Sequence, residues 1–498
     1  MIFGNFKIQT KPNSPSTHTV VVCLLFASIL TLGGCVNDFG IKSSSTIAKP
    51  SHFPTNKSLP KQKGHWPTTN WAKQFGDPQL ESLINEALAD NPSLHVAKAR
   101  LTQARALAEN KRSAFFPAIT LQSQADRGRL SATLFPPSLG GGSWFTFGEF
   151  LYRMNYDLDL WGKNLARYRQ ALSQEKAREA ATQEAQLTIA TSVASAYNQL
   201  AYYNSLRQVL SRTVTQRISL EKISSVRLQT GLDTKVQLYQ SRNTRATAKT
   251  QLAEVEGQIL VTRQQLGTLL GKGPDRGLSI KNPRLKSVNT PQLPPELPLH
   301  LLGRRPDIVE ARWNVEAICQ GVKNIKAQFY PDVNLAAIAG FLSLGLNRLF
   351  ESASTEYQIG PVLSLPIFDG NNLRSQLRGQ YGAYEEAVAQ YNLVLNNALS
   401  DVANQIASIR SADQQLKIQI EALYTSERAF NLATVQYRTG LASQLVILDA
   451  ETLYLDAQQA RLQLLTNRRN LQIALIKSLG GGFTTCCLAS TKKYLRNK

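Results

Sequence analysis

The feature that most constrains this chain is a Thr-Gly-Leu turn that occurs twice, as Thr230-Gly231-Leu232 and Thr439-Gly440-Leu441, 209 residues apart. Each turn interrupts a long stretch that contains no proline. Glycine suits a helix end at which the chain reverses, because it adopts a positive φ without a Cβ clash. The pattern predicts two long helix hairpins and indicates an internal duplication.

Four further landmarks recur in one order at nearly the same spacing. They pair residues 91–94 with 305–308, 116–117 with 330–331, 162–165 with 370–373, and 269–271 with 478–480. Unrelated turns between helices would not be expected to keep a common order and spacing. We therefore predict two structural repeats, residues 65–281 and 299–481, joined by a Pro-rich linker at residues 282–298.

The first 34 residues have the form of a lipoprotein signal peptide. Lys7 and Lys11 precede an apolar run at residues 20–32 that is too short to cross a bilayer as a helix. The ending Leu32-Gly33-Gly34-Cys35 resembles a lipobox, in which the signal is cut before the cysteine and the cysteine is acylated. We expect covalent diacylglycerol and palmitate at Cys35, followed by a lipid-anchored extended linker at residues 35–64. An uncleaved signal anchor is the alternative.

Composition argues against an enzyme or a metalloprotein. The cysteines show neither CxxC spacing nor a Cys/His cluster, and the five histidines are scattered. No HExxH motif, nucleophile elbow or phosphate loop is present. We therefore predict no catalytic residues, no metal and no cofactor apart from the lipid at Cys35.

The formal net charge of +21 is spread along the expected helices without a nucleic-acid-binding motif. This favours solvated helix faces over a nucleic-acid partner. Residues 482–498 form a basic tail that contains Cys486 and Cys487.

Two segments between the expected helices change to a period of two, which indicates strands. In residues 150–160, Phe150, Tyr152, Met154 and Tyr156 occupy alternate positions, and the intervening positions from Arg153 to Asp159 are polar or charged. Similar alternation predicts β-hairpins at about 118–161 and 332–367. One aromatic and one ionic face are typical of a membrane barrel with a wet lumen, so we expect the four large side chains to face lipid. A strand pair packed on a soluble core is the alternative.

Four strands cannot close a barrel in lipid, because small membrane barrels begin at about eight strands. Open edges within the bilayer would leave backbone groups unsatisfied, at several kcal/mol each. Three copies would supply twelve strands, whereas two would leave little lumen. We therefore expect a homotrimer.

Each strand hairpin is followed by a long helix hairpin, at residues 165–271 and 373–480. The first arm, of roughly 60 residues, could extend about 90 Å. Many positions that would face a neighbouring helix are Ala, Gln or Asn, which suits a wall of helices lining water. An ordinary coiled-coil stalk is the alternative.

The lipobox, the segment Trp66…Phe75-x-Asp77-x-x-Leu80, both strand hairpins and residues 437–450 together resemble the outer membrane factor (TolC-type) family. The lipoprotein OprM/NodT branch is the more similar part of that family. The resemblance implies a mainly α fold with a membrane β part, in which a trimeric twelve-stranded outer-membrane β-barrel continues into a long periplasmic α-helical barrel. Most of the chain would then lie in the periplasm.

The resemblance also implies a function. The trimer would be the passive duct of a tripartite efflux system that exports small molecules or drugs across the outer membrane. Its partners would be a periplasmic adaptor (membrane fusion) protein, an inner-membrane transporter of the resistance-nodulation-division (RND) or a related type, and outer membrane lipid. The alternatives are a type I secretion channel and an anchored coiled-coil structural lipoprotein without a pore.

In the OprM branch, the start of the last long helix lines the closed periplasmic aperture with an apolar and an acidic ring, which correspond here to Leu445 and Asp449. Around a threefold axis the Asp449 carboxylates would repel one another and favour nearby cations. A first-turn acid that complements the helix dipole is the alternative. A family arginine one turn further on is Thr452 here, so a lock of the closed state would need another partner, such as Arg438.

The adaptor would dock on the tips of the two helix hairpins. The tip residues are Thr230, Gly231, Leu232, Thr439, Gly440 and Leu441.

Overall fold

The structure is a computed structural model that describes residues 40–48, 52–54, 57–59, 64–286 and 301–484. The predicted signal peptide and Cys35 lie outside the described residues. So do most of the linker at residues 282–298 and most of the tail at residues 482–498.

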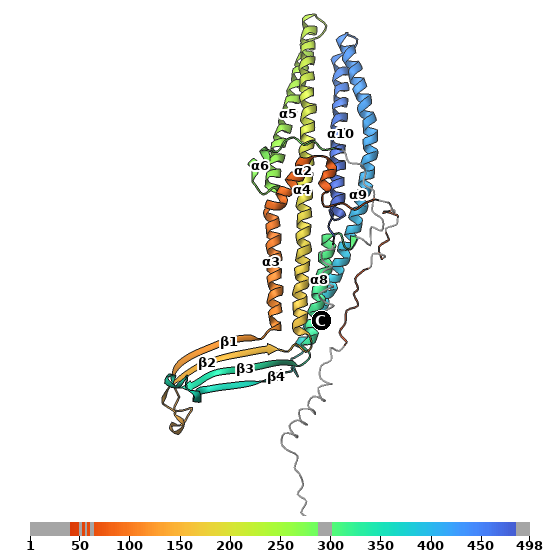
Figure 1. The fold of residues 1–498 in the computed structure, drawn as a ribbon. Coiled ribbons are helices and arrows are strands. Elements are labelled where there is room, and N and C mark those ends of the chain that lie inside the picture. Colours follow the sequence, from red (N-terminus) through yellow and green to blue (C-terminus); the bar gives the residue numbers. More distant parts are fainter. Residues whose placement is uncertain (1–39, 49–51, 55–56, 60–63, 287–300, 485–498) are drawn as a thin grey trace, which may run out of the picture. The chain divides into compact units, whose positions relative to one another are not determined.

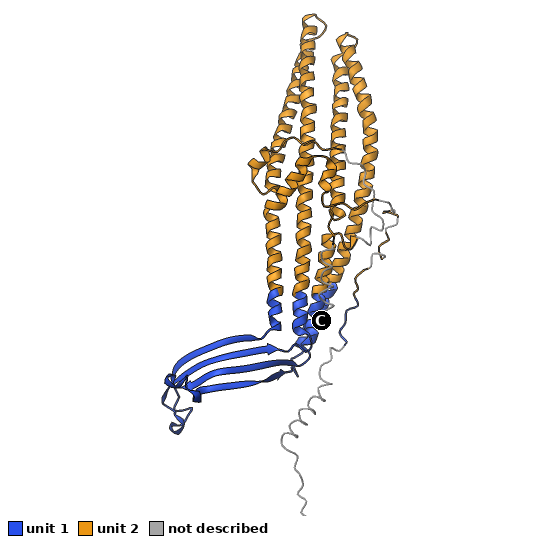
Figure 2. Ribbon diagram, in the orientation of Figure 1, with its two compact units in different colours: residues 1–44, 109–170, 318–385 blue, residues 45–108, 171–317, 386–498 orange. Residues whose placement is uncertain are grey.

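The described chain is mainly helical and contains four strands (Figure 1), as predicted. The helices are α2 (Pro78–Asp90), α3 (Pro92–Arg112), α4 (Lys163–Gln229), α5 (Lys235–Leu269), α6 (Pro274–Leu278), α8 (Pro306–Ala327), α9 (Asn372–Arg438) and α10 (Gln444–Ser478). The strands are β1 (Ala118–Arg129), β2 (Trp144–Asp157), β3 (Asp332–Leu344) and β4 (Thr355–Ser364). The chain forms two compact units (Figure 2), of which the first holds the whole sheet, at residues 109–170 and 318–385.

The duplication appears in the helix lengths and in the contacts at the helix ends. Helices α4 and α9 each have 67 residues, and α5 and α10 each have 35. Near the C-terminus of α5, the Leu269 carbonyl accepts a hydrogen bond of 2.7 Å from the Asn91 side chain. Near the C-terminus of α10, the Ser478 carbonyl accepts one of 3.4 Å from Arg305. Asn91 and Arg305 occupy equivalent positions in the two predicted repeats. Equivalent residues of the two repeats therefore make equivalent contacts.

The four strands form one antiparallel sheet in chain order, so the two predicted hairpins are joined through β2 and β3. Directly paired residues of such a sheet share a face, and alternate residues of a strand lie on opposite faces. On one face, called here the apolar face, the cross-strand rows include Leu121-Tyr152-Ala339-Tyr357 and Ile119-Met154-Ala337-Ile359. On the other, called the polar face, they include Thr120-Arg153-Ile338-Gln358 and Gln122-Leu151-Gly340-Glu356.

Side-chain contacts agree with this division of the sheet. On the apolar face, the Phe150 ring lies 6.0 Å from Tyr152 and 5.8 Å from Phe350, measured between centroids. On the polar face, Arg153 Nη2 lies 2.9 Å from Glu149 Oε1. The sheet thus has one aromatic and aliphatic face and one face that carries an ion pair.

Strand β2 ends at Asp157, so Leu158 to Leu160 lie beyond it, although the sequence pattern extended the strand to Leu160. The reason is local, because Asp159 adopts a φ of 36°. Its carboxylate accepts 2.8 Å hydrogen bonds from the backbone N–H groups of Asn164 and Leu165, which start α4. The need to cap the helix therefore outweighs the alternation of apolar residues.

The second unit contains the helical core, which explains the motif that begins at Trp66. Phe75 and Leu80 are buried in a cluster with Tyr197 of α4. The Asp77 carboxylate accepts hydrogen bonds from the backbone of Gln79, at 3.0 Å, and from the Tyr197 hydroxyl, at 2.7 Å. The motif thus caps α2 and ties it to α4. Among the described residues, no helix is long and apolar enough to cross a membrane.

Candidate gate and docking site at the helix tips

The two Thr-Gly-Leu segments form the same turn. Gly231 and Gly440 have φ values of 75° and 81°, which a residue with a Cβ rarely adopts. The N–H of Leu232 donates to the Arg227 carbonyl, and the N–H of Leu441 donates to the Gln436 carbonyl, both at 2.8 Å. Each bond satisfies a carbonyl at the end of a long helix and directs the chain into the returning helix.

A polar cluster joins the two tips of one chain. Arg227 on α4 pairs with Asp233, with Nε 3.0 Å from Oδ2, and its Nη1 donates to the Tyr437 carbonyl on α9 at 3.1 Å. The Tyr437 hydroxyl donates to the same Asp233 carboxylate at 3.1 Å. The Arg227 guanidinium also lies over the Tyr437 ring, 4.9 Å from its centroid. Both hairpins are therefore held by one arginine and one carboxylate.

The surroundings of this cluster shift the pKa values of Tyr437 and Arg227. Burial, and the neighbouring Asp233 carboxylate, raise the pKa of Tyr437 to about 12. The hydrogen bonds to Asp233 raise the pKa of Arg227 above its ordinary value. Both groups are thus held in their protonated forms at neutral pH.

A groove of about 660 Å³ lies at these tips. Its apolar lining includes Ile223, Val226 and Leu232, and its basic lining includes Lys222 and Arg438. Of the six predicted docking residues, Thr230, Leu232, Thr439 and Gly440 line the groove. Leu441 is outside its lining but has 82% of its surface exposed, so the tips present apolar side chains to solvent.

The predicted gate residues lie on the side of α10 that faces away from the chain's own core. Leu445 is 65% exposed and Asp449, one turn further on, is also exposed. Ile447 and Glu451, each two residues beyond one of the gate positions, are buried. Leu445 and Asp449 are therefore free to meet other copies of the chain.

Among the described residues, neither Thr452 nor Arg438 forms an ion pair that could lock the closed state. The Thr452 hydroxyl donates to the Leu448 carbonyl of its own helix, at 2.8 Å. Arg438 is exposed and makes no ion pair with any described carboxylate. Arg227, which sequence reasoning missed, makes the contact between the tips instead.

A second contact missed from the sequence joins α4 to α10. Arg217 Nε lies 2.9 Å from Glu451 Oε2, and the Glu451 side chain is completely buried. Burial raises the pKa of Glu451, and the Arg217 charge partly opposes that shift. The partners are 234 residues apart, so no local pattern marks them.

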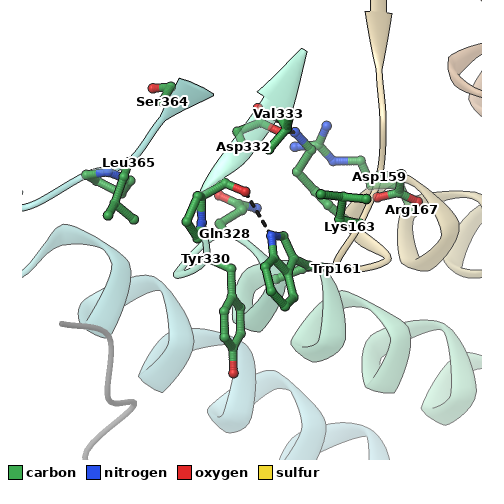
Figure 3. A pocket seen from close by; sticks show the side chains of 14 residues that line it. Asp159, Trp161, Lys163, Arg167, Gln328, Tyr330, Asp332, Val333, Ser364 and Leu365 are labelled. Carbon is green, nitrogen blue, oxygen red and sulfur yellow. Dashed lines mark hydrogen bonds and ion pairs between the residues drawn. The ribbon is translucent and has the colours of Figure 1, made fainter. Parts of the chain in front are cut away.

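At the helix-bearing end of the sheet, a pocket of about 450 Å³ is lined by residues after β2, at the start of α4, around the start of β3 and at the end of β4 (Figure 3). Trp161 and Tyr330 stack beside it, with ring centroids 4.7 Å apart. Lys163 Nζ lies 2.8 Å from carboxylate oxygens of both Asp157 and Asp332. Stacked Trp and Tyr side chains at the end of an apolar sheet face are typical of a membrane–water boundary.

Comparison with known proteins decides the family. The family model described as outer membrane efflux protein matches residues 83–272 and 297–481, one match for each repeat. The chain belongs to this family. It is an outer membrane efflux protein, not an enzyme, and its helical part spans the periplasm.

Individual relatives match over most of the chain. The multidrug resistance outer membrane protein MdtP of Escherichia coli (strain K12) is 29% identical over 473 residues, which cover 93% of this chain and 96% of MdtP. The fusaric acid resistance protein FusA of Burkholderia cepacia is 32% identical over 371 residues, 73% of this chain and 70% of FusA. The crystal structure of the outer membrane protein VceC from Vibrio cholerae matches with a TM-score of 0.79 and 35% identity, covering 84% of this chain and all of VceC.

Proposed function

We propose that three copies of this efflux protein form one closed duct, with a twelve-stranded barrel in the outer membrane and a helical barrel in the periplasm. The observation that carries the proposal is the sheet. Its apolar face is exposed, with Tyr357 and Ile359 at 78% and 74%, and β1 and β4 are edge strands. An apolar face and two open edges are both satisfied when copies join edge to edge in lipid.

The duct would export small molecules that an inner-membrane transporter, of the RND or a related type, delivers through a periplasmic adaptor. The names of MdtP and FusA, which refer to multidrug and fusaric acid resistance, favour small-molecule substrates over secreted proteins. The groove at the helix tips supplies apolar and basic side chains for adaptor docking. We further propose that acylated Cys35 anchors each copy after removal of residues 1–34.

We propose that Leu445 and Asp449 close the periplasmic end. Three Leu445 side chains around the threefold axis would form a dry constriction, and three Asp449 carboxylates would form a cation-attracting ring. Their exposure on α10, away from the buried positions of Ile447 and Glu451, supports this role. Adaptor binding at the tips would open the constriction without any chemical step.

Single-channel recordings in planar bilayers test the gate. We expect Leu445→Ser to raise the closed-state conductance severalfold, because a polar ring admits water. Asp449→Ala should also raise it and should reduce the preference for cations. Asp456→Ala, which removes another exposed carboxylate two turns further along α10, is the matched control and should behave like the wild type. Unchanged conductance and selectivity in both gate variants would remove these residues from the gate.

A further inference from the structure

The apolar face of the sheet changes character toward the loop ends of the strands. By the register, Arg127 pairs with Thr146 and Arg129 pairs with Trp144. These rows lie an even number of residues from the Leu121–Tyr152 row, so both arginines and Trp144 share the face of Leu121 and Tyr152. Two guanidinium groups therefore stand on the face that elsewhere carries aliphatic and aromatic side chains.

The side chains are held in place but remain accessible. The Arg127 guanidinium lies 5.5 Å from the centroid of the Trp144 ring. Arg129 Nε donates a 2.8 Å hydrogen bond to the Gly142 carbonyl in the loop between β1 and β2. Trp144 is 65% exposed, and both arginines are exposed. The loop and the indole ring of β2 thus hold two cationic groups that lie two residues apart on β1.

No described carboxylate neutralises these two arginines. Neither forms an ion pair within 4.0 Å in the described part of the chain. The neighbouring Asp126 lies on the polar face, where its carboxylate accepts a hydrogen bond from Gln124. The two positive charges are therefore available to a partner outside this sheet.

The distance along the strands puts the arginines at a boundary of the bilayer. Tyr156 and Thr146, which pairs with Arg127, are ten residues apart on β2, about 34 Å along a strand. At a strand tilt of about 40°, this is about 26 Å along the membrane normal, close to the roughly 25 Å apolar band of outer-membrane barrels. Tyr156 and the stacked Trp161 and Tyr330 would mark one edge of the band, and Arg127 and Trp144 the other.

The connectivity of the chain indicates which leaflet of the outer membrane lies at Arg127 and Trp144. The helices adjoin the strands at the Asp157 end of β2, and the helical part is periplasmic. The Trp144 end therefore faces the outer leaflet, whose lipopolysaccharide carries phosphate groups on its lipid A sugars. Exposed guanidinium groups pair well with phosphate, because their N–H groups match its oxygens.

We propose that Arg127 and Arg129, beside Trp144, bind the phosphate groups of outer-leaflet lipopolysaccharide. The acyl chains of that lipid would cover the apolar face below, at Leu121 and Tyr152. This inference rests on the proposed barrel, because only the barrel places this face in the bilayer. The contact would fix the height of the barrel in the membrane, since two cations cannot move into the hydrocarbon without loss of their partner.

Lipid binding to the purified, full-length trimer tests the proposal, with native mass spectrometry as the measurement. The probes are lipid A bearing its phosphates, the same lipid after enzymatic removal of the phosphates, and inorganic phosphate. We expect the phosphorylated lipid to bind the wild type roughly tenfold more tightly than the dephosphorylated lipid. Arg127→Gln/Arg129→Gln should lose that difference. Arg410→Gln/Lys417→Gln, which removes two exposed positive charges from α9, should retain it.

Three results would overturn the proposal. The first is equal binding of both lipids to the wild type, which would indicate apolar adsorption only. The second is full competition by inorganic phosphate at the lipid's own concentration, which would indicate a free-anion site. The third is an unchanged preference in the double variant. If the double variant fails to assemble, the single variant Arg127→Gln leaves the Arg129 bond to the loop intact and should still lose severalfold in preference.

Trimer mass and conductance, measured on the same preparations, distinguish a failure of the proposed barrel from a failure of the lipopolysaccharide site alone. Wild-type protein that forms no conducting trimer would overturn the proposed barrel and this site together. A conducting trimer whose lipid preference is independent of Arg127 and Arg129 would overturn the site alone.

Discussion

At the scale of single residues, Tyr437 makes the stability of the contact between the two helix tips depend on pH. Its pKa of about 12 lies above the ordinary value of 10.0, so the folded protein favours the neutral phenol. The Tyr437–Asp233 hydrogen bond therefore contributes fully to the free energy of unfolding below pH 10, and this contribution is lost as the pH rises through about 12. We expect Tyr437→Phe to lower stability by about 1 to 3 kcal/mol at pH 8, because the hydrogen bond to the Asp233 carboxylate is lost.

Thermal unfolding followed by circular dichroism between pH 8 and pH 12 checks this prediction. The gap in melting temperature between wild type and Tyr437→Phe should narrow above pH 10. Tyr239→Phe, at an exposed tyrosine of α5, should match the wild type throughout. A gap that stays constant up to pH 12 would contradict the assignment.

Some single-residue features of the helix tips could be predicted from the sequence, and others could not. The turns at Gly231 and Gly440 were predictable, because the same Thr-Gly-Leu motif occurs twice and glycine adopts the positive φ that such a turn requires. The pairing of Arg217 with Glu451 was not, because each is one of many charged residues on its helix and the partners meet only through tertiary packing. Arg227 was missed for the same reason, since it binds both its own turn and the other tip.

At the scale of elements, the two glycine turns should respond alike to substitution. A Cβ at Gly231 would meet no atom within 4 Å, and one at Gly440 would meet only the end of Arg227, at 3.8 Å. Gly231→Ala and Gly440→Ala should therefore each cost about 1 to 2 kcal/mol from backbone strain alone. Chemical denaturation of the helical part measures this cost.

Gly257→Ala is the matched control for the turn variants. Gly257 lies within α5 without positive φ, and a Cβ there would meet no atom within 4 Å. Because alanine favours a helix over glycine, this variant should stabilise by roughly 0.5 to 1 kcal/mol. A loss of stability at Gly257 equal to that at Gly440 would show that packing, and not φ, limits these positions.

The boundaries of helices and strands agreed with those predicted from the sequence where a single physical effect determined them. The period of two predicted the strands, because each has one apolar face. The end of β2 was misplaced because Leu158 and Leu160 continue the alternation, while Asp159 starts the next helix. The joining of β2 to β3 in one sheet had no signature, because cross-strand partners such as Tyr152 and Ala339 are 187 residues apart.

At the scale of the whole molecule, the central question is what covers the apolar face of the sheet. Ile359 and Gln358 are neighbours on β4, but they belong to opposite faces. If the apolar face meets lipid, a charge at Ile359 must enter hydrocarbon, whereas a charge at Gln358 enters the wet lumen. We expect Ile359→Lys to destabilise the assembled barrel by about 2 to 4 kcal/mol and Gln358→Lys to change its stability by far less.

Heat-induced dissociation of the trimer, followed by electrophoresis without boiling, measures the difference between these variants. Gln358→Lys should also shift the selectivity of the open channel toward anions, because it adds one positive charge per copy to the lumen. Ile359→Lys should leave the selectivity of any assembled channel unchanged. The reverse result, with Gln358→Lys the more damaging variant, would mean that the polar face packs against protein. The sheet would then not be part of a wall between lipid and water, because only such a wall requires one face of each kind.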